Sequence, residues 1–174
     1  TPIVKAWPSD YALEANSIAI QVYGGAGYTR DFPVERLWRE NRINAIHEGT
    51  NGIQAMDLLG RKLISDKGHS FALLTTRVEK TLASAHHIEA LKPLADVLQI
   101  RWAKFLPALK QVATVFENDA ELALANAYLL LDAMGHAVVA WLWLDQAVCA
   151  EGLLAQADLS ESRRNLLKGK IVAA

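Results

Sequence analysis

A strongly apolar segment, rich in alanine and leucine, extends from Asp119 to about Leu153. Asp132 and His136 interrupt it one helical turn apart, and Asp145 follows, so the run of 18 or more apolar residues typical of a membrane span is missing. A helix that is apolar on nearly all sides has to be covered by other elements. The segment therefore predicts a long, buried central helix and no membrane span.

The rest of the chain also spaces its apolar residues as helices do, and the alternation typical of β-strands persists nowhere. Ser9 is expected to cap the first helix and Thr50 or Asn51 the third, whereas glycines after Tyr23 and at Gly68 should end helices. The expected helices cover about 9–23, 33–47, 51–65, 71–82, 94–112 with a kink at Pro107, 119–153, and a last stretch that begins at Asp158 or Ser160.

These elements predict an all-α fold class. Residues 1–68 should belong to an up-and-down helical bundle that is truncated at its N-terminus, and residues 69–174 should form an additional C-terminal helical bundle. The composition agrees with a packed fold, because 52% of the 174 residues are hydrophobic and only 5 are prolines. Such a composition excludes a disordered or collagen-like chain.

The charge distribution argues against a nucleic-acid or membrane-surface partner, because the net charge is -1 and acidic and basic residues are interspersed. A single cysteine, Cys149, excludes an internal disulfide, and its Ala-Val-Cys-Ala setting predicts a small core residue. His86 and His87 are adjacent and point to different helix faces, so we expect no metal site there.

The two ends of the sequence predict a piece of a longer protein. Thr1–Trp7 has neither an initiator methionine nor the basic and apolar regions of a signal peptide, and the C-terminal residues are apolar. We therefore expect a fragment of a larger cytoplasmic protein.

Two further groups of side chains have structural interpretations. Asp132 and His136 are expected to form a buried hydrogen-bonded pair rather than a second active site. Trp102, Trp141 and Trp143 are expected to anchor the core or a subunit interface.

Two short segments could carry chemistry. The glycines of Gln21-Val-Tyr-Gly-Gly-Ala-Gly-Tyr28 either end a helix or let the backbone approach a ligand without interference from side chains. Glu48 lies between His47 and Gly49 in the segment AIHEGTNGIQ, where it is either a solvated carboxylate or a base held at a turn beside a cofactor. The residues alone leave both alternatives open.

Taken in order, several segments between about Ser9 and Leu63 resemble the C-terminal helical domain of acyl-CoA dehydrogenases. The second half resembles the extension of a larger subgroup, which includes bacterial fatty-acyl-CoA and 3-methylmercaptopropionyl-CoA dehydrogenases. The segments that carry the resemblance are Gln21-x-x-Gly-Gly-x-Gly-Tyr28, Phe32-Pro-Val-Glu-Arg-Leu-Trp-Arg39, Arg42-Ile-Asn-x-Ile46, Glu48-Gly-Thr50 and Ile53-Gln54.

The resemblance implies a catalytic role for Glu48, as the base that removes the α-proton of an acyl-CoA thioester while the β-hydrogen leaves as hydride to flavin N5. A carboxylate held in an apolar, water-poor pocket becomes a stronger base. Gly49 would leave room for the thioester. His47 would either line the substrate pocket or be an ordinary half-buried histidine.

The resemblance also implies FAD as the cofactor. Gln21, Gly24 and Gly25 hold the positions that meet the adenosine-diphosphate part of a neighbouring subunit's FAD, and Thr50 matches a residue near the flavin. Relatives often carry glutamine or glutamate where this chain has Gly52, which leaves only a backbone role for that position. FAD is expected in the full-length enzyme and not in the fragment, which should be inactive alone.

The implied partners are an acyl-CoA substrate, electron-transferring flavoprotein as electron acceptor, and further copies of the chain in a dimer or tetramer. A competing hypothesis is a non-catalytic module that uses the same scaffold for oligomerisation or DNA association. Glu48 favours the enzyme. The near-neutral charge argues against DNA, since each phosphate contact needs a cation.

Overall fold

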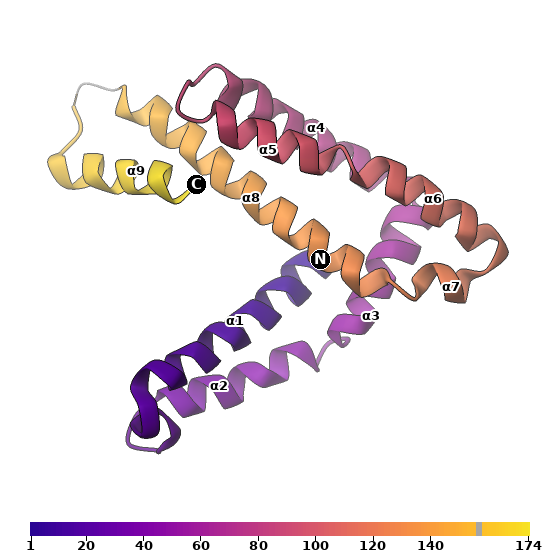
Figure 1. The fold of residues 1–174 in the computed structure, drawn as a ribbon, viewed down its shortest axis with the longest axis horizontal. Helices are drawn as coiled ribbons and strands as arrows, with labels where there is room; N and C mark the ends of the chain where they lie inside the picture. Colours follow the sequence, from indigo (N-terminus) through magenta and orange to yellow (C-terminus); the bar gives the residue numbers. More distant parts are fainter. Residues whose placement is uncertain (156–157) are drawn as a thin grey trace.

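The computed structural model describes residues 1–155 and 158–174, and every regular element within these residues is a helix (Figure 1). The all-α prediction is thus confirmed. The helices are α1 (Pro2–Tyr23), α2 (Val34–Arg42), α3 (Asn51–Met56), α4 (His69–His86), α5 (Lys92–Trp102), α6 (Phe105–Asn118), α7 (Ala120–Leu124), α8 (Ala127–Leu154) and α9 (Glu161–Ala173). Three further helical stretches lie between them: the 3₁₀-helices η1 (Gly24–Tyr28) and η2 (Ile43–Ala45), and the π-helix η3 (Asp57–Ser65).

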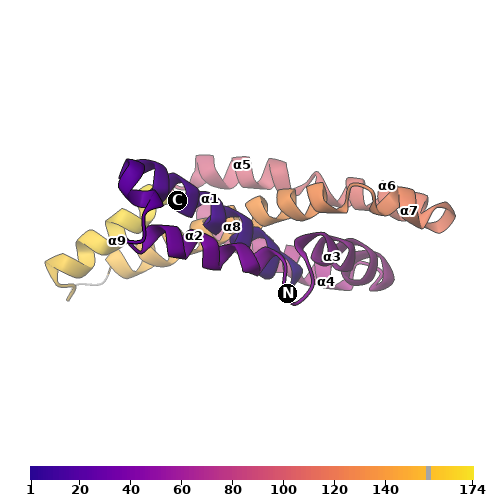
Figure 2. The same cartoon turned by 90° about the horizontal axis from the view of Figure 1, so that it is seen from below.

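Helix α8 runs through the middle of the molecule and contacts α1, α3, α4, α5 and α9 (Figure 1). The hairpin of α1 and α2 projects from one side of α8, and the pair α4 and α5 lies on the other side. Seen edge-on, the helices form a thin layer (Figure 2). The division into parts at residue 68 stays a prediction.

Helix α8 contributes residues along its length to the core, which confirms the expected central position of this helix. Its buried residues are Ala127, Leu131, Met134, Gly135, Ala137, Leu144, Ala147 and Ala150. Leu129, Leu142 and Trp143 of the same helix are exposed, so α8 is covered in part and not all round.

The stretch Ala120–Leu154 is long and apolar enough, by length and composition, to cross a membrane. The core helices of water-soluble proteins meet the same criterion. The prediction that this segment does not span a membrane therefore stays a prediction.

Cys149 corrects one expectation, because its thiol is free and exposed rather than part of the core. The physical reason is the helical period. Ala147 and Ala150 occupy the buried face of α8, and Cys149, two residues after Ala147, falls about 200° away from it.

Helix α1 begins seven residues earlier than predicted, at Pro2, and Ser9 lies inside it instead of capping it. Ser9 is buried, and its hydroxyl donates to the carbonyl oxygen of Ala6 at 2.8 Å. The end of the helix was predicted correctly, since Gly24 closes it with a positive φ of 61°.

The stretch 94–112 is two helices rather than one kinked helix. Helix α5 ends at Trp102 and α6 begins at Phe105, so Ala103 and Lys104 separate them, and Pro107 occupies the first turn of α6. A first-turn position has no partner for a backbone N–H, so proline costs little there. Pro107 therefore marks a new helix.

Several caps agree with the sequence. The Thr50 hydroxyl accepts from the Ile53 N–H at the start of α3, and Gly68, with φ 78°, follows η3. The last helix begins after Ser160, whose hydroxyl accepts from the Arg163 N–H, so the cap is Ser160 and not Asp158. Local capping signals thus mark the starts of α3 and α9.

The tryptophans follow the anchoring prediction to different degrees. Trp102 is buried, stacks on Phe71 with ring centroids 5.8 Å apart, and donates to Thr75 Oγ1 at 3.1 Å. Trp141 is half-buried and donates to the buried Thr81 hydroxyl at 2.9 Å, which joins α8 to α4. Trp143 is exposed on the other side of α8.

Candidate active site

The backbone at Glu48 and Gly49 turns in the left-handed region, with φ of 55° and 85°. A residue with a side chain adopts this conformation at a cost of about 1–2 kcal/mol, and glycine adopts it freely. A glutamate held this way is a strained residue, and such strain concentrates at functional sites. The Glu48–Gly49 turn is therefore the first place to look for chemistry.

Two side chains hold the carbonyl groups of this turn. Gln54 Nε2 donates to the Glu48 carbonyl oxygen at 3.1 Å, and Lys5 Nζ donates to the Gly49 carbonyl oxygen at 2.8 Å. Thr50 caps the helix that follows. The strained backbone is thus fixed from α3 on one side and from α1 on the other.

Beneath the turn, Asn51 is the centre of a buried polar cluster and is only 7% exposed. Its Oδ1 accepts from Lys5 Nζ at 2.9 Å. Its Nδ2 donates to Ser9 Oγ at 3.0 Å and to Asp10 Oδ1 at 2.8 Å. The amide oxygen faces a cation and the amide nitrogen faces an anion, so the electrostatics define the orientation of the amide.

The second oxygen of Asp10 accepts a hydrogen bond from the Tyr128 hydroxyl of α8. This bond, then burial, raises the pKa of Tyr128 to about 12. The hydroxyl therefore remains a proton donor throughout the neutral range. Helix α8 is joined in this way to the polar cluster under the turn.

The Glu48 side chain itself is exposed, and it makes no hydrogen bond within the described ranges 1–155 and 158–174. The apolar pocket implied by the family resemblance is thus not built by this part of the protein. His47 is also exposed, and its Nε2 lies 3.1 Å from Asn44 Oδ1. The carboxylate is free to meet whatever covers the turn.

The predicted residues fall into two groups at opposite ends of α1. The first group lies beside the N-terminal end of α1, because Lys5 of that helix binds the turn. It consists of His47, Glu48, Gly49, Thr50 and Gly52. The other group is Gln21, Gly24 and Gly25, at the far end of the helix. Lys5 and Gln21 are separated by about 24 Å of helix.

The glycine turn at the far end has an open surface. Gln21, Gly24 and Gly25 are exposed, and a Cβ added at Gly24 or Gly25 would meet nothing within 4 Å. The positive φ of Gly24 explains why glycine occupies that position. The backbone of Gly25 has no positive φ, so its conformation does not require glycine. An exposed backbone without side chains leaves room for a ligand or another chain to approach it closely.

Asp132 and His136 differ from the buried pair that was expected. Both side chains are partly exposed, and their partners lie across on α1. The Tyr11 hydroxyl donates to Asp132 Oδ1 at 3.3 Å and lies 2.9 Å from His136 Nε2, and Trp7 Nε1 donates to His136 Nδ1 at 3.3 Å. The rings of Trp7 and Tyr11 cover only one side of this pair, which explains the exposure.

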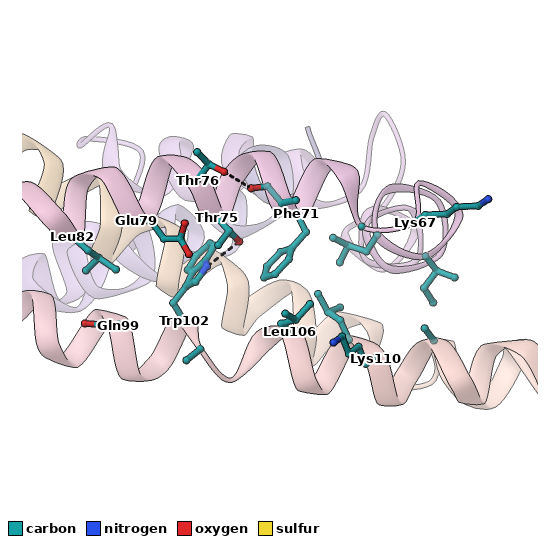
Figure 3. Close-up of a pocket in the computed structure, with 17 residues that line it drawn as sticks. Lys67, Phe71, Thr75, Thr76, Glu79, Leu82, Gln99, Trp102, Leu106 and Lys110 are labelled. Carbon is teal, nitrogen blue, oxygen red and sulfur yellow. Dashed lines mark hydrogen bonds between the residues drawn. The ribbon is translucent and has the colours of Figure 1, made fainter.

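Two large grooves of the described residues lie elsewhere. A groove of about 940 Å³ lies between α4 and the α5–α6 segment, lined mainly by apolar side chains such as Phe71, Leu82 and Trp102 (Figure 3). A second groove of about 670 Å³ lies between α5 and α8. Neither is lined by Glu48 or by the glycine turn.

Lys5, Asp10, Gln54 and Tyr128 were not predicted as site residues, and Asn51 was predicted only as an alternative cap. Lys5 and Ser9 are four residues apart on one face of α1, and this spacing was a local signal that they could act together. Nothing local links them to Tyr128, which is more than a hundred residues away.

Comparison with known proteins gives two family matches that together cover most of the chain. Residues 1–64 match the family model described as acyl-CoA dehydrogenase, C-terminal domain. Residues 74–174 match the family model described as acetyl-CoA dehydrogenase C-terminal like.

Three curated relatives align over 99% of this chain. The 3-methylmercaptopropionyl-CoA dehydrogenase of Ruegeria pomeroyi is 31% identical and covered to 29% of its length. The butyryl-CoA dehydrogenase of Syntrophomonas wolfei is 30% identical and covered to 28%. The broad-specificity linear acyl-CoA dehydrogenase FadE5 of Mycobacterium tuberculosis is 28% identical and covered to 29%. The chain thus spans less than a third of the length of these relatives.

Proposed function

This chain belongs to the acyl-CoA dehydrogenase family, and we propose that it is the C-terminal part of an enzyme that dehydrogenates an acyl-CoA thioester between Cα and Cβ. The observation that carries the proposal is the Glu48–Gly49 turn. A strained backbone is held at both carbonyl groups, whereas the carboxylate it presents is free. Fixing the backbone and leaving the side chain free is what a positioned base requires.

Glu48 removes the α-proton of the thioester. That proton is weakly acidic, so the base has to be held at hydrogen-bond reach of it and has to be shielded from water. Gly49 adds no Cβ beside the reacting carbon. His47 and Thr50 flank the carboxylate, His47 toward the substrate and Thr50 toward the flavin, and Gly52 contributes only backbone.

FAD is the cofactor of the proposed enzyme, and when bound it supplies the acceptor for the β-hydride. The residues of this chain that would hold it are Gln21, Gly24 and Gly25. Their exposed backbone and the open space at Gly25 fit the approach of a phosphate-bearing group. A site at the opposite end of α1 from the Glu48–Gly49 turn suits the cofactor of a neighbouring subunit, because the two ends of α1 would face different active centres.

The substrate class is an acyl-CoA thioester. The names of the relatives specify a butyryl, a linear acyl and a 3-methylmercaptopropionyl group, so the shared chemistry is the thioester and not the chain attached to it. Electron-transferring flavoprotein is the proposed electron acceptor, the assembly a homo-oligomer, and the location the cytoplasm.

The test is the variant Glu48→Gln in the full-length enzyme. Glutamine keeps the shape of the side chain but cannot accept the α-proton, so we expect turnover to fall by about 10²–10⁴. FAD content, measured by flavin absorbance, should not change. Glu14→Gln is the matched control, because Glu14 is an exposed glutamate on α1 away from the turn. Near-normal turnover of Glu48→Gln would refute the proposed role.

A further inference from the structure

The Glu48–Gly49 turn is connected to α8 by an unbroken chain of side-chain hydrogen bonds. It runs from the Gly49 carbonyl oxygen to Lys5, on to Asn51 and Asp10, and ends at the Tyr128 hydroxyl. Its side chains come from α1, α3 and α8. It starts at the carbonyl group of Gly49, the residue that directly follows the candidate base Glu48. We propose that Tyr128, acting through Asp10, Asn51 and Lys5, is a positioning residue for Glu48.

The burial of Asn51 ties its amide to its protein partners. At 7% exposure the amide cannot exchange its partners for water, and a buried polar group left without a partner is costly. Its oxygen binds Lys5 and its nitrogen binds Asp10. The nitrogen also donates to Ser9 Oγ at 3.0 Å and to the Ala6 carbonyl oxygen at 3.3 Å, so Asp10 is its one charged acceptor among three. Losing that acceptor weakens the hold on the amide, and a shift of the amide would move the partner of Lys5.

The two oxygens of Asp10 are divided between two helices. Oδ1 accepts from Asn51 at the start of α3, and Oδ2 accepts from Tyr128 of α8. Without the Tyr128 hydroxyl, the Asp10 carboxylate can turn toward water and loosen its hold on Asn51 Nδ2. The Asn51 amide can then shift on its remaining partners, and Lys5 Nζ, the donor to the Gly49 carbonyl oxygen, is held less firmly.

Tyr11 provides a control within the same pair of helices. Its hydroxyl also joins α1 to α8 and also donates to an aspartate, Asp132. None of its partners, Asp132 and His136, binds a residue of the chain that leads to Gly49. Tyr11→Phe and Tyr128→Phe therefore remove the same chemical group between the same two helices, but only Tyr128→Phe interrupts the path to the turn.

The experiment uses the full-length enzyme with FAD and compares these two variants and Lys5→Met. We expect Tyr128→Phe to lower kcat about fivefold, and Lys5→Met at least as much, because small misplacement of a base has large effects on rate. KM and FAD content should stay within twofold of wild type. Hydrogen–deuterium exchange of the backbone at residues 45–54 should become faster in both variants, and Tyr11→Phe should match wild type in every measurement.

The inference rests on the proposed function only where it names Glu48 as the base. If Glu48→Gln is fully active, the proposed function fails, but the exchange measurement still decides whether Tyr128 controls the turn. Unchanged exchange at 45–54 in Tyr128→Phe would overturn the inference. So would equal effects of Tyr128→Phe and Tyr11→Phe, since these would show that the hydroxyl serves only helix packing.

Discussion

Gly49 shows how a single residue can serve both the backbone and the site. Its φ is 85°, and a Cβ added there would lie 3.0 Å from Gln54 Nε2, the donor that holds the Glu48 carbonyl oxygen. A side chain at position 49 would therefore strain the turn and displace one of its two holding groups.

We predict that Gly49→Ala lowers kcat of the full-length enzyme at least tenfold and lowers the free energy of unfolding by about 1–2 kcal/mol. Steady-state kinetics and thermal unfolding measure the two effects. Gly169→Ala is the control, because its added Cβ meets nothing within 4 Å and its φ is not positive. Wild-type kinetics in Gly49→Ala would mean that the turn tolerates a side chain.

The role of Glu48 was implied by the family resemblance of the segments around it, but the side chains that support the turn were not predicted. Thr50 could be predicted as a cap because a cap acts on a backbone group three residues away. Ser9 was misassigned for the opposite reason: its partner Asn51 is 42 residues away, and only the packing of α1 on α3 brings them together. Long-range polar contacts leave no local pattern to read.

At the scale of elements, α1 and α8 approach closely at Gly135. A Cβ at this buried position would fall on the indole ring of Trp7. Gly152 lies on the same helix, but a Cβ there would meet nothing within 4 Å. The two glycines of α8 thus differ in burial and in what faces them.

We predict opposite effects for the same substitution at these two sites. Gly135→Ala should lower the free energy of unfolding by about 1–3 kcal/mol, because the α1–α8 contact has to open. Gly152→Ala should raise it by about 0.5–1 kcal/mol, because alanine favours a helix interior. Chemical denaturation of the chain would measure both, and a stabilising Gly135→Ala would contradict the close approach.

Element boundaries were predictable where one residue ends or starts a helix, as at Gly24, Gly68 and Ser160. They were not predictable where one continuous apolar pattern extends over two separate helices. The spacing of apolar residues continues unchanged from α5 into α6, yet the backbone breaks at Ala103 and Lys104. The apolar pattern gives the buried face of a segment without showing whether its backbone is continuous.

At the scale of the whole molecule, the thin layer of helices leaves much apolar surface in water. Along the α1–α2 hairpin, the exposed large apolar residues are Val4, Ile18, Val22, Tyr23, Tyr28, Phe32, Leu37, Trp38, Ile43 and Ile46. Burying each such side chain contributes on the order of 1.5–3 kcal/mol. A surface of this kind favours association.

We predict that the 174-residue chain self-associates, most simply as a two-fold dimer. Light scattering over a dilution series measures this. Val22→Lys should weaken the association, because it places a charge on the hairpin, whereas Val172→Lys makes the same change at an exposed site on α9. A monodisperse monomer at micromolar concentration, or equal effects of the two variants, would contradict the prediction.

Helix α1 carries one group of candidate residues at each end, and this geometry has a genetic consequence. In the proposed assembly, Glu48 works in its own subunit, whereas Gln21 works at the cofactor of a neighbour. A subunit with Glu48→Gln and a subunit with Gln21→Ala would each be defective alone. A mixed dimer would combine both defects in one active centre and leave the other centre intact. Two inactive alleles should therefore complement each other.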